Sequence, residues 1–337
     1  MANIWFCILV VCAGMYAVLD GFDFGAGMLH RIVAKTDAER RTVLAAIGPY
    51  WDGNEVWLIA LGGILFCAFP SVLGAALSGL YLAVFHILWA LLLRGIAIEF
   101  RSHIEEPLWR AFWDTVFQLS SLALAVLFGA ALGNLMRGFA IDKDGVLDIS
   151  LFDGLKLVDE NGILDGYAVL IGIFVTVALA SHGALFLLWK TEGEVQARCL
   201  KLANGLFGAR FVFWAISAGC TFLVRRDIFG GSHALMWIFF AVSIAMLGGS
   251  IAMHAKGKTR SAFILSGANI FALVAMCAAA SFPELLHART GASYLVQPSA
   301  TPDSALVTGL KWWLPAVVLV ATYFTLVFRF HRGKTKV

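Results

Sequence analysis

Four carboxylic acids lie inside or at the mouth of long apolar stretches, where acids are uncommon. Asp20 and Asp23 interrupt the first stretch, and Asp52 and Glu55 precede the apolar run 56–77. A charged group at membrane depth costs about 2.5 to 3.5 kcal/mol on insertion scales, so it usually marks a functional site. Carboxylates there can relay protons by exchanging them through water or with a neighbouring acid. We expect Asp20 and Asp52, helped by Glu55 and Asp23, to form a proton path.

The same acids also allow a purely structural interpretation. Asp52 and Glu55 have the spacing of a capping box with Asp52 as N-cap, and acids suit a helix N-terminus. Asp20 and Asp23 would then pair at the membrane interface with a base such as Arg31. Under this alternative the chain is a structural anchor, and neutralising Asp20 or Asp52 would leave turnover intact.

Few other residues have side chains that could take part in catalysis or ligand binding. The segment 94–101 closes a further apolar run and supplies three possible charge partners, Arg94, Glu99 and Arg101. Its two arginines could pair with the acids or could simply be basic residues of the cytoplasmic side. The six cysteines fall mostly inside apolar runs and form no CxxC pair, so they predict neither a disulfide framework nor a metal site. No phosphate-binding loop, dinucleotide fingerprint or nucleophile–base arrangement is present. We therefore expect no catalytic residue and no metal site in this chain.

Two of the eight histidines, His86 and His182, lie well inside apolar runs. A haem requires axial ligands of this kind. Neither histidine sits in a recognisable ligand motif, and an isolated helical histidine is more often a hydrogen-bonded packing residue. We expect neither to bind haem.

The elements that must position these acids are membrane helices. The chain is 60% hydrophobic and only 14% charged, with a mean hydropathy of +0.84, whereas soluble domains carry about 25% charged residues. Runs of about 20 apolar residues span a bilayer as helices. The first run is too long, and lacks the basic flank, to be a cleaved signal peptide. We predict an all-α membrane protein with nine spans, at 4–29, 54–77, 79–98, 115–136, 166–189, 204–223, 234–253, 262–281 and 312–330.

The basic residues predict an orientation. Seventeen of the 25 lysines and arginines fall on one side of these nine spans, and the excess of basic residues marks the cytoplasmic side. The N-terminus is then outside and the C-terminus inside. Asp20 would lie about 24 Å along the first helix, past the midplane toward the cytoplasm. Gly21 and Gly25 beside it have the spacing that lets another helix approach closely.

We expect one membrane domain, 1–337, with internal organisation. Gly25-Ala26-Gly27 followed by Lys35-Thr36 resembles Gly183-Ala184 followed by Lys190-Thr191, which suggests a faint repeat. The repeat predicts two related helical bundles, 1–136 and 166–281, with a ninth helix at 312–330. The loops 137–165 and 282–311 would face outward; the first is acidic, with residues Asp142, Asp144, Asp148, Asp153, Asp159, Glu160 and Asp165.

A repeat with intramembrane acids also suits a proton-coupled secondary transporter. Such a transporter should have helices broken near the midplane, and the Gly62-Gly63 pair is the best candidate for a break. No convincing partner for that pair appears in the second half of the chain. The transporter is therefore the alternative interpretation.

Several motifs resemble those of a known family. The blocks are DGFDFGAGML from Asp20, GPYWDGNEVW from Gly48 and RGIAIEFR from Arg94, with Phe69-Pro70 and Ser78-Gly79-Leu80-Tyr81 between them. In type, order and spacing they resemble subunit II of the cytochrome bd-type quinol oxidases. The resemblance is dense over 15–110 and returns at 181–185 and 190–194. Glu55 stands where some members have glutamine, and the chain is similar to the cyanide-insensitive oxidase branch.

The resemblance implies a respiratory complex of the bacterial cytoplasmic (inner) membrane. Subunit I of such a complex carries haem b and haem d and oxidises quinol near the outer face, and dioxygen is reduced to water. Protons are taken from the cytoplasm, so a proton-motive force arises without pumping. Asp20 and Asp52 match the family's acids that are associated with a proton route. The expected partners are subunit I, small single-helix subunits, quinone and the lipid bilayer, and no nucleic acid.

Overall fold

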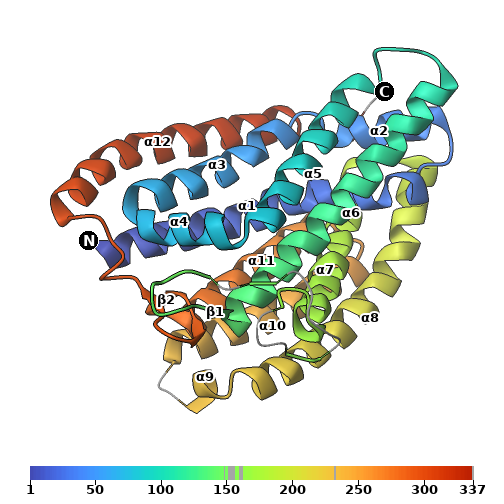
Figure 1. Cartoon of the computed structure of the whole chain (residues 1–337). Helices are drawn as coiled ribbons and strands as arrows, with labels where there is room; N and C mark the ends of the chain where they lie inside the picture. The colour runs from blue at the N-terminus through green and yellow to red at the C-terminus, as the bar shows by residue number, and fades with distance from the viewer. Residues whose placement is uncertain (148, 151–155, 159–161, 231–232, 336–337) are drawn as a thin grey trace.

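The computed structural model describes residues 1–147, 149–150, 156–158, 162–230 and 233–335 (Figure 1). Helices dominate it, with four short strands in the connections. The helices are α1 (Ala2–Val33), α2 (Asp37–Ile47), α3 (Trp51–Ala68), α4 (Pro70–Gly79), α5 (Tyr81–Phe100), α6 (Pro107–Arg137), α7 (Gly166–Lys190), α8 (Gly193–Val224), α9 (Asp227–Gly230), α10 (Ala234–Ala255), α11 (Thr259–Ser281) and α12 (Asp303–Phe330). The strands are β1 (Phe139–Ala140), β2 (Glu284–Leu286), β3 (Ala288–Thr290) and β4 (Tyr294–Leu295).

The predicted all-α membrane fold is confirmed. Among the described residues, eight helices are long and apolar enough to cross a membrane, or nine if the bent pair α3 and α4 forms one span. Three helices begin at least eight residues earlier than the apolar runs suggested: α6 at Pro107, α8 at Gly193 and α12 at Asp303. Polar first turns extend these helices beyond the apolar runs, so hydropathy alone underestimates their length.

The prediction of one continuous helix over 54–77 is wrong. α3 and α4 meet at Phe69 with a bend of 117°. Pro70 lacks an amide hydrogen and disfavours helical geometry at the preceding residue, and Phe69 accordingly has φ −137° and ψ 57°. The helix is unbroken through Gly62-Gly63, so α3 lacks the midplane break that a transporter would need.

α1 lies at the centre and packs against α3, α6, α7 and α11 (Figure 1). Two glycines make its contact with α7 possible. A Cβ atom built on Gly25 would lie 2.2 Å from the carbonyl oxygen of Leu179, and one built on Gly183 would lie 2.3 Å from the carbonyl carbon of Gly25. The close approach predicted for Gly21 and Gly25 is therefore confirmed, with α7 as the neighbouring helix.

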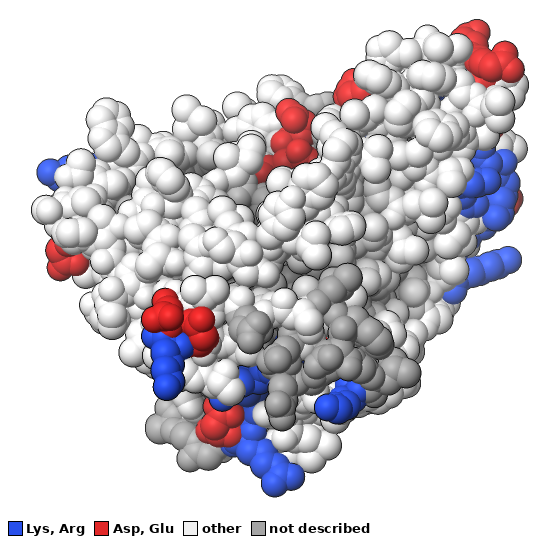
Figure 2. All heavy atoms as spheres, viewed as in Figure 1, with Lys and Arg blue, Asp and Glu red and all other residues white. Residues whose placement is uncertain are grey.

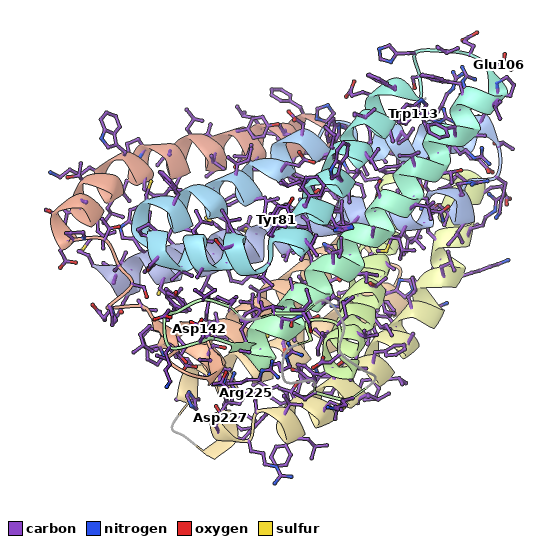
Figure 3. The ribbon with its side chains drawn as sticks, in the orientation of Figure 1. Tyr81, Glu106, Trp113, Asp142, Arg225 and Asp227 are labelled. Carbon is purple, nitrogen blue, oxygen red and sulfur yellow. The ribbon has the colours of Figure 1, made fainter. Side chains whose placement is uncertain are left out.

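The two ends of the molecule differ in structure. At the loop end, β1 pairs in parallel with β3, which joins the connection after α6 to that before α12, and β2 pairs with β4. Figure 3 shows Asp142, Arg225 and Asp227 near this end and Glu106 at the opposite end. Four acids of the predicted acidic loop, Asp148, Asp153, Asp159 and Glu160, lie outside the described residues.

The opposite end, which we call the α2 end, is formed by α2, the α5–α6 connection and the C-terminal residues. Figure 2 shows lysine and arginine side chains gathered on this edge, with a second mixed group at the loop end. Between the two lies a broad face with few charged side chains, interrupted by an acidic patch. Many large apolar side chains of α5, α10 and α12 are exposed, as suits contact with lipid or with another membrane subunit.

Candidate functional site

Three helices bring two of the predicted acids to one arginine. Arg94 of α5 donates from Nη1 to Asp20 Oδ1 of α1 and from Nη2 to Glu55 Oε1 of α3, each over 2.5 Å. The side chains of Asp20 and Arg94 are fully buried, whereas 29% of the Glu55 side chain is exposed. The guanidinium also lies over the Phe24 ring, 4.6 Å from its centroid. The fork geometry of arginine lets one cation bridge two carboxylates.

The third predicted acid, Asp23, lies beside a residue that the sequence analysis did not single out. Asn54 Nδ2 donates to Asp23 Oδ2 over 2.7 Å and to the carbonyl oxygen of Leu19 over 3.1 Å. Asp23 and Asn54 are both buried. Asn54 therefore ties α3 to α1 within one helical turn of Asp20. The sequence could have pointed to Asn54, because it is the only amide side chain between the acids Asp52 and Glu55.

Asp52 occupies a different environment from the other three acids. It is exposed in the first turn of α3, where Tyr50 is the N-cap residue and no side-chain cap hydrogen bond forms. The capping-box interpretation is therefore wrong, and Glu55 instead bonds to Arg94. Asp52 and Glu55 remain on one side of the helix, since they are three residues apart.

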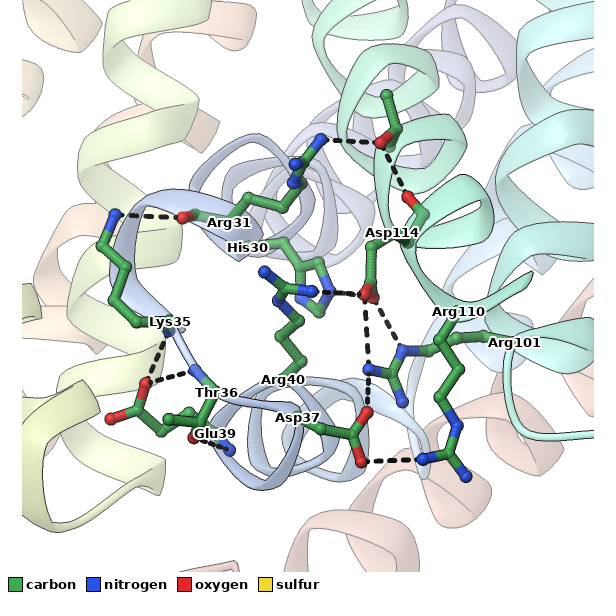
Figure 4. Close-up of polar contacts among 12 residues, drawn as sticks. His30, Arg31, Lys35, Thr36, Asp37, Glu39, Arg40, Arg101, Arg110 and Asp114 are labelled. Atoms are coloured by element: carbon green, nitrogen blue, oxygen red, sulfur yellow. Dashed lines mark hydrogen bonds and ion pairs between the residues drawn. The ribbon is translucent and has the colours of Figure 1, made fainter. Parts of the chain in front are cut away.

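A second charged cluster lies at the α2 end, around a buried acid that the sequence analysis missed (Figure 4). Asp114 of α6 accepts from His30 over 2.6 Å, from Arg101 Nε over 2.7 Å and from Arg40 over 3.1 Å. Its side chain is fully buried. Asp114 was overlooked because the predicted helix began at 115, whereas α6 begins two turns earlier, at Pro107.

The other candidate charge partners, Arg101, Glu99 and Arg31, do not contact Asp20 or Asp23. Arg101 donates from Nη2 to Asp37 over 2.7 Å as well as to Asp114, so it serves this cluster and not Asp20. Glu99 is exposed at the end of α5. Arg31 donates to the Thr115 hydroxyl and not to Asp20 or Asp23, so the pairing suggested for it is wrong.

Glu39 links α2 to α8 at the same end. It closes a capping box with Thr36, and its Oε2 also accepts from Arg198 Nη1 over 2.9 Å. The hydrogen bond from Arg198 is the largest influence, and with two backbone amides it lowers the pKa of Glu39 to about 2. Glu39 is therefore a permanent anion at neutral pH, which suits a structural link.

The two membrane histidines lie in different surroundings, and only His182 has both ring nitrogens engaged by described residues. His182 is fully buried and both ring nitrogens are engaged, Nδ1 with Ser266 Oγ and Nε2 with the carbonyl oxygen of Val18. No nitrogen is left for iron. His86 lies on the exposed surface of α5, with Nδ1 bonded to the Leu82 carbonyl over 2.6 Å.

The fold and the site together define a class of protein. It is a polytopic helical membrane protein in which a buried arginine joins a buried acid to a partly exposed one near one end of its spans. Residues 1–331 match the family described as cytochrome bd terminal oxidase subunit II. The chain belongs to that family, which confirms the resemblance drawn from its motifs; the cyanide-insensitive branch stays a prediction.

Individual relatives agree over most of the chain. It is 32% identical to the cytochrome bd ubiquinol oxidase subunit 2 of Bacillus subtilis (strain 168), over 87% of this chain and 83% of that protein. It is 30% identical to the cytochrome bd-I ubiquinol oxidase subunit 2 of Escherichia coli (strain K12), over 94% and 89%. A chain of the bd oxidase from Geobacillus thermodenitrificans shares the fold, with a TM-score of 0.70, 17% identity and 98% of each chain covered.

Membership in this family makes the chain one subunit of a terminal oxidase, an oxidoreductase complex. With eight to nine candidate spans among its described residues, it is a multi-pass protein of the bacterial inner membrane.

Proposed function

We propose that this chain, as subunit II of a bd-type quinol oxidase, supplies a proton path from the cytoplasm and scaffolds haems held by subunit I. The observation that carries the proposal is that Arg94 holds the partly exposed Glu55 and the fully buried Asp20 beside one guanidinium. The guanidinium keeps its own protons, so a proton would pass between the two carboxyl groups directly or through water. This arrangement connects an acid that water can reach with one that water cannot. A protonatable group at each end of such a bridge is what a relay requires.

Charge balance supports a proton-carrying role. Three carboxyl groups, of Asp20, Asp23 and Glu55, share the single guanidinium of Arg94 among the described residues around them. If all three were ionised, the cluster would hold two uncompensated negative charges at membrane depth, which costs several kcal/mol. A bound proton relieves that cost. The cluster can therefore take up a proton that enters from the cytoplasm and release it to an acceptor deeper in the complex.

Asp52 is proposed as the collecting acid of this path. It is exposed at the start of α3, one turn before Glu55, where it can exchange protons directly with water. Asp23, which accepts a hydrogen bond from Asn54, is proposed as a second proton-binding group beside Asp20. The order Asp52, Glu55, Asp20 runs from exposed to fully buried. The excess of basic residues at the α2 end supports a cytoplasmic position for that end.

The haems and the substrate are assigned to the complex as a whole. The curated relatives are named ubiquinol oxidase subunits, which supports quinol as the reductant here. His182 has no free nitrogen, which supports haem b and haem d on subunit I. If quinol releases protons outside while Asp52 takes them up inside, turnover is electrogenic without pumping. Further proposed contacts are small single-helix subunits and lipid on the exposed apolar faces of α5, α10 and α12.

The transporter alternative loses its main support. It required a helix broken near the midplane, but α3 is continuous through Gly62-Gly63 and bends only at Phe69. No observation on the described residues favours it over the oxidase.

A reduced-minus-oxidised optical spectrum of membranes tests the subunit assignment. The chain is expressed with and without its subunit I, and haem b and d bands are expected only when both are present. The Asp20→Asn variant then tests the path, since it should lose most quinol-driven oxygen consumption while the haem d band stays normal. Asp303→Asn is the control, because that side chain is 75% exposed at the loop end. Normal turnover in Asp20→Asn would refute the proton role of Asp20.

A further inference from the structure

A chain of buried hydrogen bonds crosses the half of the protein that the proton path does not use. Arg210 Nη1 of α8 donates to Ser266 Oγ of α11 over 3.2 Å, and Ser266 Oγ lies 3.1 Å from His182 Nδ1 of α7. His182 Nε2 in turn lies 3.1 Å from the carbonyl oxygen of Val18 in α1. At most 1% of Arg210, Ser266 or His182 is exposed.

The chemistry of its members gives this chain one direction. A backbone carbonyl only accepts, so Nε2 of His182 must carry a hydrogen. A guanidinium only donates, so Ser266 Oγ accepts from Arg210 and its own hydrogen is left for Nδ1 of His182. Every donor therefore points from Arg210 toward α1. A neutral His182 ring satisfies all the bonds, and a second cation beside Arg210 would not be balanced.

Arg210 differs from the other deeply buried arginines. Arg94, Arg101 and Arg137 each form an ion pair with a carboxylate. The hydrogen-bond partners of Arg210 among the described residues are neutral, Ser266 Oγ and Asn269 Oδ1. Asn269 in turn donates to the carbonyl oxygen of Ser243 over 2.7 Å. Because no ion pair to a carboxylate is found for Arg210 among the described residues, its positive charge polarises the hydrogen bonds that lead away from it. Hydrogen-bond chains of this kind are strengthened in a low-dielectric interior.

The chain ends two residues before Asp20. The next carbonyl along α1, that of Leu19, accepts from Asn54 on α3. Two neighbouring carbonyls of α1 are thus held by different helices, one by α7 and one by α3. Together they fix both the rotation of α1 and its position along its axis just where the acid that meets Arg94 leaves the backbone.

We propose that His182 is a positioning residue that holds Asp20 against Arg94. Ser266 orients its ring, and the positive charge of Arg210 polarises its hydrogen bonds. The proposal rests on the role of Asp20 proposed above. His182 does not itself carry protons along this route, because the chain begins at a guanidinium that stays protonated and ends at a carbonyl that cannot accept a proton. It acts through geometry alone. Loss of its hydrogen bond lets α1 rotate and loosens the contact between Asp20 and Arg94.

The test compares His182→Leu with His182→Gln in the assembled two-subunit oxidase. Glutamine keeps an N–H donor for the Val18 carbonyl, whereas leucine fills similar space without one. The first readout is the labelling of Asp20 by dicyclohexylcarbodiimide, located by tandem mass spectrometry, since this reagent attacks protonated carboxyl groups in apolar surroundings. The second readout is the pH profile of oxygen consumption. Ser250→Ala is the control, because it removes another buried hydrogen bond between α10 and α11.

His182→Leu is expected to raise Asp20 labelling by about threefold to tenfold, the equivalent of one lost hydrogen bond, and to shift the pH profile at normal haem content. In His182→Gln, Asp20 labelling and the pH profile should both lie close to those of the parent protein. Ser250→Ala should change neither the labelling nor the profile. Unchanged labelling and an unchanged profile in His182→Leu would overturn the proposal, and so would a failure of glutamine to rescue. If His182→Leu does not assemble, Ser266→Ala removes the middle bond with a smaller change, and unchanged labelling there is equally decisive.

The two proposals fail separately. Normal turnover in Asp20→Asn refutes the proton path, while a rise of Asp20 labelling in His182→Leu still supports positioning by His182. Conversely, loss of turnover in Asp20→Asn with unchanged labelling in His182→Leu keeps the path and removes the positioning residue.

Discussion

Gly25 of α1 and Gly183 of α7 meet backbone to backbone, so closely that a Cβ atom built on Gly25 would lie 2.7 Å from the Cα atom of Gly183. The contact lies one turn from Asp20 along α1 and next to His182 on α7. Neither glycine can be replaced without moving one of the two helices. The position of the candidate site therefore depends on a contact between two residues that carry no chemistry.

We expect Gly25→Ala to destabilise the complex, because the added methyl group would lie 2.2 Å from the Leu179 carbonyl oxygen. Overpacking of this kind typically costs about 1 to 3 kcal/mol. The measurement is the temperature of half-inactivation of the purified oxidase, together with its haem d content.

Gly62→Ala is the matched control for that variant. Nothing lies within 4 Å of a Cβ atom built on Gly62, and alanine is the better helix former, so stability should hold or rise. Equal stability of Gly25→Ala and the parent protein would show that α1 and α7 are not held by this crossing.

Arg94→Met should be among the most damaging single changes in the chain. It leaves Asp20 buried without its cation, and removal of one partner of a buried ion pair typically costs about 3 to 5 kcal/mol. Arg94→Lys should recover only part of the loss, because a lysine cannot offer the two-armed fork that reaches both Asp20 and Glu55. Oxygen consumption and thermal inactivation measure the two effects.

The control for the Arg94 variants is Arg226→Met, which removes an exposed arginine near the loop end. It should change neither quantity. If Arg94→Met matched Arg226→Met, the bridge between Asp20 and Glu55 would have no role in stability or turnover.

Glu55→Gln should slow turnover more than Asp52→Asn. Glu55 is bonded to the buried Arg94, and a hydrogen bond to a charged group is worth roughly 1.5 to 3 kcal/mol, so a loss of about tenfold or more is expected. Asp52 is exposed, and water can replace much of its role, so its loss should cost about threefold or less. Steady-state oxygen consumption at matched haem d content measures both.

The opposite ranking of these two variants would show that proton entry, and not transfer between Glu55 and Asp20, limits the path. Unchanged turnover in both variants would remove Asp52 and Glu55 from it altogether.

Glu39→Gln should weaken the α2 end of the protein in a pH-dependent manner. The pKa of Glu39 is lowered from 4.5 to about 2 by its hydrogen bond with Arg198 and by two backbone amides. A carboxylate with a lowered pKa stabilises the folded state above its unfolded pKa, and this contribution is lost as the pH falls toward the folded value. The parent should therefore exceed the variant by a constant margin from pH 7 to about 5, and the margin should shrink below about 4.5.

Thermal inactivation across that pH range is the measurement. Glu194→Gln is the control, since Glu194 meets the same arginine but its side chain is 75% exposed. A margin that does not shrink in acid would mean that Glu39 acts by shape alone.

The positions of the acids along the membrane could be predicted from the sequence. Long apolar runs and the fixed rise of a helix place Asp20 deep in its span and Asp52 at the start of another, because both depend only on neighbouring residues. The bend at Phe69 could also have been predicted, since Pro70 disfavours helical geometry at the residue before it. A continuous apolar run concealed it.

Which charged residue meets which acid was decided by tertiary structure. Arg94 lies 74 residues from Asp20 in sequence, yet it, and not the nearer Arg31, forms the ion pair. Arg101, seven residues beyond Arg94, faces a different cluster built around Asp114. Hydropathy sets the depth of a helix in the membrane, but its rotation follows from packing against neighbours far away in the chain. The partners of Asp20 therefore depend on helix contacts such as that of Gly25 with Gly183, which hydropathy does not reveal.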